Sequence, residues 1–167
     1  MATTIRGSDN WDSALAKSVA IIADVKAYNV NGGTFTQDAF RIRDLNTEID
    51  DPSNIVTLAS NQFTLQAGTY LIEWSAPAFG VNQHYSRLWN DTDSATVAEG
   101  TAPFSSVSSA GWNASTGATI QTISGAKAFE IQHRCQTTRG TNGFGLAVAV
   151  NVLNSVYTTV KIHLIGV

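Results

Sequence analysis

The sequence predicts an all-β protein, a β-sandwich or jelly roll of one domain that follows a short N-terminal arm. Three observations indicate this fold class. The 167 residues suffice for one domain with a core of its own. Charged residues make up only 14%, and Thr, Ser and Asn supply the remaining polarity, which suits strands and turns better than surface helices. Eight to ten segments alternate between apolar and polar residues, with turn signals between them.

The first 18 residues differ from the rest of the chain. Trp11 stands in a polar stretch, and Asp12 or Ser13 can cap a helical turn that is too short to be stable alone. We interpret residues 1–18 as an attachment arm, with Trp11 and Asp12 as its contact residues, and residues 19–167 as the jelly-roll domain. A leader without fixed structure is the alternative interpretation.

Alternating segments follow one another from residue 19 to the C-terminus, and clusters of Gly, Asn and Asp separate them. In the longest segment, Tyr70, Ile72 and Trp74 share one face, while Leu71, Glu73 and Ser75 share the other. The segments with strand-like patterns cover residues 21–28, 40–45, 63–65, 69–79, 85–90, 95–98, 105–123, 129–135, 146–150 and 157–165. No helix of normal length is expected after residue 18.

Two of these segments carry charged or reactive residues. In residues 40–45, the alternation places Phe40 and Ile42 on one face and both arginines on the other. In residues 129–135, one face carries Phe129, Ile131, His133 and Cys135.

Composition and charge argue against several classes of protein. The net charge is −3, so no basic field for nucleic acid or anionic lipid is present. Apolar runs such as residues 19–23 are too short to span a bilayer, and the first residues have no apolar signal core. The single cysteine, Cys135, cannot form an internal disulfide, which fits synthesis in a reducing cytoplasm. We expect neither a nucleic-acid partner nor membrane insertion.

The sequence offers no catalytic constellation. It contains no Gly-x-Ser-x-Gly motif, and Cys135 and His133 are next-but-one neighbours on one strand, about 7 Å apart at the backbone. We therefore interpret Cys135 as a buried structural residue and expect no enzyme activity.

Metal sites are also poorly supported. His84, His133 and His163 lack the spacing of metal ligands, although a threefold axis can gather one histidine from each of three chains. Turn-forming aspartates explain the acidic residues 48–51 and 91–93 more simply than calcium binding does. We expect no metal and no cofactor.

Loops rich in aromatic and amide side chains suggest recognition of a sugar. An aromatic face stacks on a sugar ring, and Asn or Gln supplies directional hydrogen bonds. The loops that we expect to recognise a ligand cover residues 81–84, 102–114 and 137–144. Arg134 and Arg139 can meet acidic surface glycans or carboxylates of another subunit, although solvated charges explain them as well. The candidate receptor-binding or glycan-binding residues are Trp112, Asn113, Tyr85, His84, Arg139 and Asn142.

Residues 61–72 carry a pattern of Phe, short strand, Gly-x-Tyr and apolar strand. The pattern resembles that of the jelly roll shared by tumour necrosis factor and the complement globular head. Residues 125–132 resemble the turn and long strand of such domains, and residues 156–165 resemble their last strand. The resemblance covers about residues 20–167 and implies a tumour necrosis factor-like jelly roll. Members of this group generally assemble as trimers.

Other segments resemble small bacteriophage and prophage virion proteins, found at the ends of tail fibres or as head fibres and spikes. These segments are residues 45–52, 60–65, 68–73 and 129–138, and residues 4–11 resemble a fibre attachment segment. The resemblance implies a homotrimer on a virion, made in the host cytoplasm, whose arm joins other virion proteins. Its expected role is adsorption to a host-surface glycan or protein.

Apolar residues on both faces of several strands also favour assembly, because a lone sandwich needs only one apolar face per sheet. The candidate interface residues are Tyr70, Trp89, Phe129 and Tyr157. The expected function is therefore that of a non-enzymatic virion structural protein that adheres through several weak sites. A capsid decoration or fibre plug without a receptor, and a cellular lectin or adhesin, are the alternatives.

Overall fold

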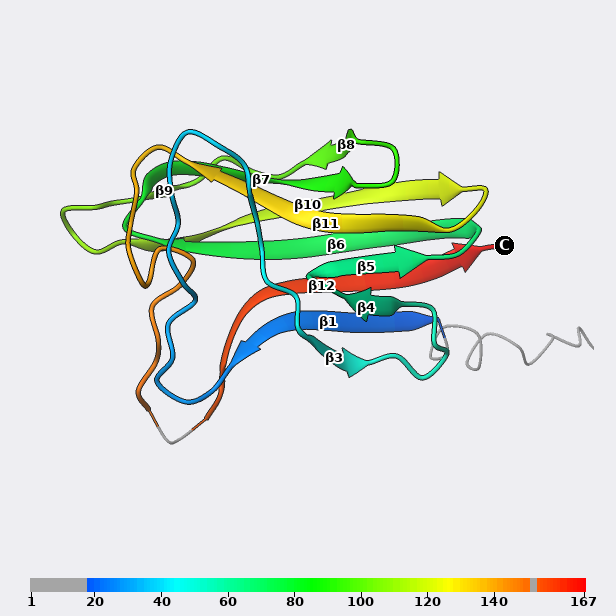
Figure 1. The fold of residues 1–167 in the computed structure, drawn as a ribbon, viewed down its shortest axis with the longest axis horizontal. Coiled ribbons are helices and arrows are strands. Elements are labelled where there is room, and N and C mark those ends of the chain that lie inside the picture. Colours follow the sequence, from blue (N-terminus) through cyan, green and yellow to red (C-terminus); the bar gives the residue numbers. More distant parts are fainter. Residues whose placement is uncertain (1–17, 151–152) are drawn as a thin grey trace, which may run out of the picture.

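A computed structural model describes residues 18–150 and 153–167. These residues form twelve β-strands and no helix, arranged as two antiparallel sheets in a sandwich (Figure 1). The all-β prediction is confirmed. None of the described residues belongs to a helix long and apolar enough to cross a membrane. The predicted arm, with Trp11 and Asp12, lies outside the described residues except for Ser18.

Each sheet is built from strands that are distant in the sequence. The first sheet has the order β10 (Trp112–Ile123), β6 (Gly68–Phe79), β12 (Ser155–Gly166), β1 (Val19–Lys26) and β3 (Thr47–Asp50). The second sheet has the order β4 (Thr57–Ala59), β5 (Gln62–Leu65), β11 (Lys127–Cys135), β7 (Asn82–Asn90) and β8 (Ala95–Glu99). In addition, β2 (Arg41–Ile42) pairs with β11, and β9 (Phe104–Ser105) pairs with β7.

The main core lies between the two sheets, because alternate residues of each strand point into that space. On β6, Tyr70, Ile72 and Trp74 are buried, as the alternation predicts. On β11, Phe129 and Ile131 are fully buried and belong to the same apolar cluster. On β6 and β11 the predicted apolar faces are therefore buried, although Glu130, on the opposite face of β11, is also only 2% exposed.

The Gly-x-Tyr segment joins the two sheets at one end of the core. Phe63 and Leu65 of β5 are fully buried. Gly68, at a φ of +157°, opens β6, and a side chain there would press on Leu164 at 2.9 Å. The Tyr70 hydroxyl donates to the Gln66 carbonyl at 3.1 Å. The tyrosine thus fills the core with its ring and fixes the turn with its hydroxyl.

The alternation fails in residues 40–45. Arg43 is 0% exposed, whereas Ile42 is 47% exposed. Only Arg41 and Ile42 pair as a strand, so the period of two does not extend to the following residues. The prediction that both arginines share a face opposite Ile42 is therefore wrong, because the Arg43 side chain points into the interior of the molecule.

The apolar run at residues 146–150 is not a strand. Leu146, Val148 and Val150 are all exposed. A strand needs a partner for its backbone groups, and no described strand pairs with this run.

Candidate functional site

Two long loops run side by side at one end of the sandwich, on the left of Figure 1. Phe35 N donates to Arg139 O and Arg139 N donates to Phe35 O, both at 2.9 Å. A small apolar cluster lies beneath them and consists of Phe35, Ala78, Val81 and Cys135, with Phe144 packed against it. This second core gives the loops a fixed position relative to the sheets.

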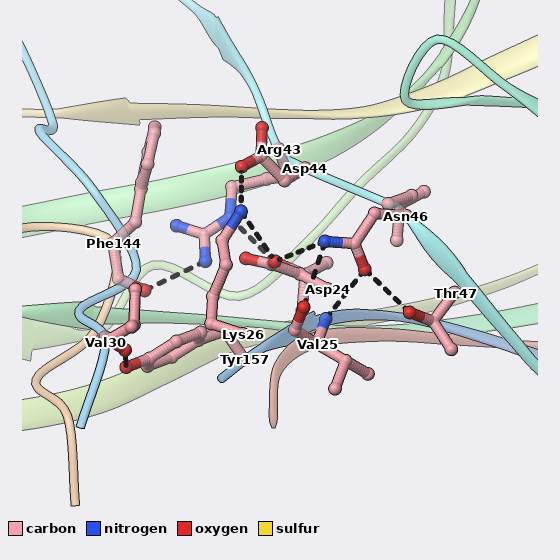
Figure 2. Close-up of polar contacts among 12 residues, drawn as sticks. Asp24, Val25, Lys26, Val30, Arg43, Asp44, Asn46, Thr47, Phe144 and Tyr157 are labelled. Atoms are coloured by element: carbon pink, nitrogen blue, oxygen red, sulfur yellow. Dashed lines mark hydrogen bonds and ion pairs between the residues drawn. The ribbon is translucent and has the colours of Figure 1, made fainter. Parts of the chain in front are cut away.

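Arg43 connects these loops to the sandwich (Figure 2). Its guanidinium donates to Thr158 Oγ1 at 2.7 Å, to Pro77 O at 3.1 Å and to Phe144 O at 2.9 Å. It also lies 4.1 Å from the centre of the Phe144 ring. Burial lowers the pKa of Arg43 to about 9, so it remains charged at pH 7. The side chain therefore acts as a structural clamp on three separate segments.

Acidic residues beside Arg43 are engaged by a lysine (Figure 2). Lys26 Nζ lies 3.1 Å from Asp24 Oδ1 and also pairs with Asp44. Burial raises the pKa of Asp24, and the hydrogen bond from Lys26 opposes that effect. Asn46 donates to Val25 O and accepts from Val25 N. The group ties the end of β1 to the segment before β3, which is a structural role.

Two histidines form a buried pair between β7 and β11. His84 Nδ1 and His133 Nε2 share a hydrogen bond of 2.9 Å, and the two side chains are 1% and 0% exposed. Burial, together with the charge of Arg43, lowers the pKa of His84 to about 4 and that of His133 well below its usual value. Both rings are therefore neutral at pH 7. The other ring nitrogens, His84 Nε2 and His133 Nδ1, have no hydrogen-bond partner within the described structure.

Cys135 lies next to this pair, but its thiol is not activated. Its Sγ is 3.4 Å from Thr137 O and 3.9 Å from Phe35 O. Burial raises the pKa of Cys135 to about 11, so the thiol stays protonated at pH 7. Since the thiolate is the nucleophile, the arrangement is unsuited to covalent chemistry.

The outer side of the second sheet carries a hollow of about 440 Å³. Tyr85 of β7 and Arg134 of β11 are cross-strand partners, and Phe104 of β9 is paired with Gln83 of β7. Gln136, directly after β11, accepts from Gln83 N through its Oε1 at 3.4 Å. We call this cavity the Tyr85 hollow; its walls are Gln83, His84, Tyr85, Ala102, Pro103, Phe104, Arg134, Cys135 and Gln136.

A stack of aromatic and cationic groups supports Tyr85 from one side. The Phe40 ring meets Tyr85 edge-on, with ring centres 5.5 Å apart. Arg87 lies 3.7 Å from the Phe40 ring centre and 4.2 Å from that of Trp89. Gln132 Oε1 accepts from the Nε of Arg87 at 2.9 Å. These contacts restrict the orientation of the Tyr85 ring beside the hollow.

The predicted receptor-binding residues lie in three places. Trp112 is 61% exposed and faces Phe79 across β10 and β6. Arg139 lies 5.0 Å from the Phe79 ring centre, and its Nε donates to Asn142 Oδ1 at 3.1 Å. The structure thus gathers Trp112, Arg139 and Asn142 around Phe79, and the exposed Asn113 follows Trp112.

The other two predicted receptor-binding residues lie elsewhere. Tyr85 lines the Tyr85 hollow, and the His84 side chain lies in the interior.

Three residues of the Tyr85 hollow were not singled out in the sequence. Phe104 falls within the predicted recognition loop 102–114 and Gln83 within the loop 81–84, but neither residue carries a pattern of its own. Gln83 and Gln136 become neighbours only through the register between β7 and β11. The register between two strands cannot be read from the sequence of either strand, so no local signal identifies the pair.

The outer face of the first sheet is the second exposed feature. One row across it consists of Ile120, Leu71, His163 and Val19, and the next consists of Ala118, Glu73, Lys161 and Ile21. Ile120 is 63% exposed. His163 Nε2 lies 3.7 Å from Glu73 Oε2. Apolar side chains therefore surround a small number of charges on this face.

Most of the aromatics predicted for a subunit interface lie inside the subunit. Tyr70, Phe129 and Tyr157 are 2%, 0% and 7% exposed. Trp89 is half-buried on the second sheet beside Arg87. The interior of one sandwich takes up these rings, so a second copy cannot reach Phe129. The exposed apolar residues of the first sheet, such as Ile120, are the ones that a neighbour can contact.

Comparison with known proteins supports the fold class. The globular domain of zebrafish complement 1qA matches with a TM-score of 0.53 and 12% identity, over 89% of this chain and 98% of that one. Murine APRIL at pH 5.0 matches with a TM-score of 0.56 and 7% identity, over 88% and 98%. No family model and no curated protein matches the sequence. The fold is therefore the jelly roll shared by tumour necrosis factor and the complement globular head, as the Gly-x-Tyr segment led us to expect.

Proposed function

We propose that this chain is a non-enzymatic, homotrimeric structural protein of a bacteriophage virion and that it contributes to adhesion to the host surface. The observation that carries the proposal is the outer face of the first sheet, where Ile120 is 63% exposed and Leu71 and Val19 lie half-buried in the same row. Contact between apolar side chains and water is unfavourable. Burial of this face against further copies of the chain would remove that cost in free energy. Domains of this jelly-roll class typically form homotrimers.

The virion setting rests on the resemblance of residues 45–52, 60–65, 68–73 and 129–138 to phage fibre and spike proteins. The scarcity of charge and the abundance of Thr, Ser and Asn fit a densely packed surface outside a cell. Three equivalent sites on one trimer would bind a repeated surface ligand with an avidity that exceeds each single contact. The exposed Trp112, at the start of β10, and the half-buried loop residue Arg139 are available for that contact.

Light scattering on the purified chain tests the assembly. The expected mass is about three times 17.8 kDa at micromolar concentration. A monomer under these conditions would remove the avidity argument.

Adsorption assays on the parent particle test the remaining part. Gold-labelled antibody should decorate the particle, and excess purified protein should compete with adsorption to host cells. Decoration without competition indicates a capsid decoration or a plug and contradicts the adhesive role. The absence of decoration contradicts the virion role and favours a cellular lectin or adhesin.

A further inference from the structure

We propose that the Tyr85 hollow binds a sugar that carries a carboxylate, such as a uronic acid unit of an acidic surface polysaccharide. This inference deepens the adhesive role proposed above and rests on it for its biological setting. The binding step itself needs only the subunit.

Strand register builds the hollow as two rows. One row carries Phe104 of β9, Gln83 of β7 and Gln136, directly after β11. The other row carries Tyr85 and Arg134 as cross-strand partners. Side chains at such positions leave the sheet on the same face and lie within reach of one ligand. A cavity of about 440 Å³ falls within the range of small-molecule sites.

Arg134 supplies the charge. Among the described residues, no carboxylate lies within ion-pair distance of its guanidinium, and no hydrogen bond engages it. By contrast, Arg43 and Arg87 are both hydrogen-bonded to several acceptors or stacked on rings. A half-buried guanidinium that has no partner in residues 18–150 and 153–167 retains its capacity for a bidentate contact with a carboxylate.

Phe104 and Tyr85 supply the surface for a ring. Phe104 is 57% exposed although it is a large apolar residue. The Tyr85 ring is held edge-on by Phe40, so little conformational entropy is lost when a ligand packs on it. The apolar CH face of a pyranose packs against such rings. The amides of Gln83 and Gln136 then lie beside the sugar hydroxyls, which need both donors and acceptors.

The combination favours an acidic sugar over other anions. A simple anion would use Arg134 and leave the exposed Phe104 ring without a role. A neutral sugar would use the rings and leave the cation without one. An acidic peptide could engage Arg134, but it presents no ring face to the two aromatics, so it is the competing outcome of the test.

Saturation-transfer NMR and titration with methyl glucuronide test the proposal on the full chain, with methyl glucoside, acetate and a Glu-containing tripeptide as comparison ligands. Methyl glucuronide should bind, and Arg134→Gln should weaken it at least tenfold. Lys127→Gln is the matched control, because it removes one charge from the other end of β11 and should leave binding unchanged. Phe104→Leu keeps an apolar side chain without a ring and should also weaken binding severalfold.

Each contrary result overturns the proposal. Absence of methyl glucuronide binding does so, as does binding that Arg134→Gln leaves unchanged in a variant that melts like the parent. Equal binding of acetate shows a simple anion site, equal binding of methyl glucoside shows a site without charge selection, and tighter tripeptide binding shows a peptide site. The hollow lies on the second sheet and the face proposed for assembly lies on the first. If the chain is a monomer and still binds methyl glucuronide, the proposed trimer is contradicted and the proposed sugar site is not.

Discussion

Arg43 shows how one residue can order several loops at once. Its three hydrogen bonds reach β12, the end of β6 and the loop that carries Phe144. Full burial of a cation is costly unless hydrogen bonds compensate it. Here two carbonyls and one hydroxyl do so, and the carboxylates of Asp24 and Asp44 add their attraction. The residue therefore stabilises the fold only as long as all of these partners remain in place.

Replacement of this clamp should destabilise the protein strongly. We expect Arg43→Met to lower the free energy of unfolding by about 2–4 kcal/mol, because it leaves buried carbonyls without donors. Urea denaturation monitored by tryptophan fluorescence measures this effect. Arg41→Met, two residues earlier and exposed, is the control and should change stability by less than about 0.5 kcal/mol. Equal effects of the two substitutions would contradict the structural role of Arg43.

The buried histidine pair predicts a dependence of stability on pH. His84 has a pKa of about 4 in the folded protein, against an ordinary value near 6.5. The unfolded chain therefore binds more protons between these values, and stability is lost as the pH falls from 6.5 to 4. The loss should be on the order of 3 kcal/mol for this histidine, and His133 adds to it in the same direction.

Denaturation curves between pH 7 and pH 4 test this expectation. His133→Phe removes one of the titrating groups and should flatten the dependence on pH. A parent protein that is equally stable at pH 7 and pH 4.5 would show that the pair is not buried in neutral form.

At the scale of elements, the pairing of β6 with β10 depends on a close approach. Gly117 faces Trp74 across the two strands, and the indole covers it so closely that a Cβ there would overlap the ring carbons. The indole Nε1 donates to Ser86 Oγ at 2.8 Å, and that hydroxyl meets Ser115 Oγ at 2.7 Å. The tryptophan thus connects both sheets and has little freedom to move away.

Addition of one methyl group at this place should therefore be costly. We expect Gly117→Ala to destabilise the protein by about 1–3 kcal/mol through overpacking, with a clear fall in the melting temperature and a shift in tryptophan emission. Gly125→Ala is the control, because a Cβ at that residue would have no other atom within 4 Å. A melting temperature that Gly117→Ala leaves unchanged would mean that the indole lies elsewhere.

The elements also show where sequence patterns are reliable. The long strands follow their alternation because both sheets bury one face along many residues, and a slip by one residue would expose all of it. In β6 this holds from Tyr70 to Ala76. Residues 40–45 and 146–150 have similar patterns, yet little or none of either pairs with a strand. Alternation of apolar and polar residues therefore predicts a buried face only where the segment pairs with a neighbouring strand.

For the whole molecule, the first sheet raises the question of what covers Ile120 and its neighbours. The core of the sandwich is complete without these residues. The exposure of Ile120 is consistent with a surface that three copies of the chain would share. The second sheet, by contrast, has its own outer layer of Phe40, Arg87 and Trp89.

A charge on the first sheet should therefore prevent assembly. We expect Ile120→Asp to lower the mass in light scattering from that of a trimer to that of a monomer, because a carboxylate in the interface would lack a partner. Ile42→Asp makes the same change at an exposed site on β2, beside the second sheet, and should leave the trimer intact. Dissociation by both variants, or by neither, would contradict an interface on this face.

The sequence alone determined the class of fold, the faces of the long strands and the Gly-x-Tyr turn, because these depend on local patterns of burial and backbone freedom. Arg139 and Asn142 lie in the predicted loop 137–144, whereas Trp112, expected in the loop 102–114, begins strand β10. Only the tertiary structure decided that Arg43 and His84 are interior and that Tyr85, Arg134 and Phe104 share a hollow. These facts depend on the register between strands that are far apart in the chain, and no local pattern records that register.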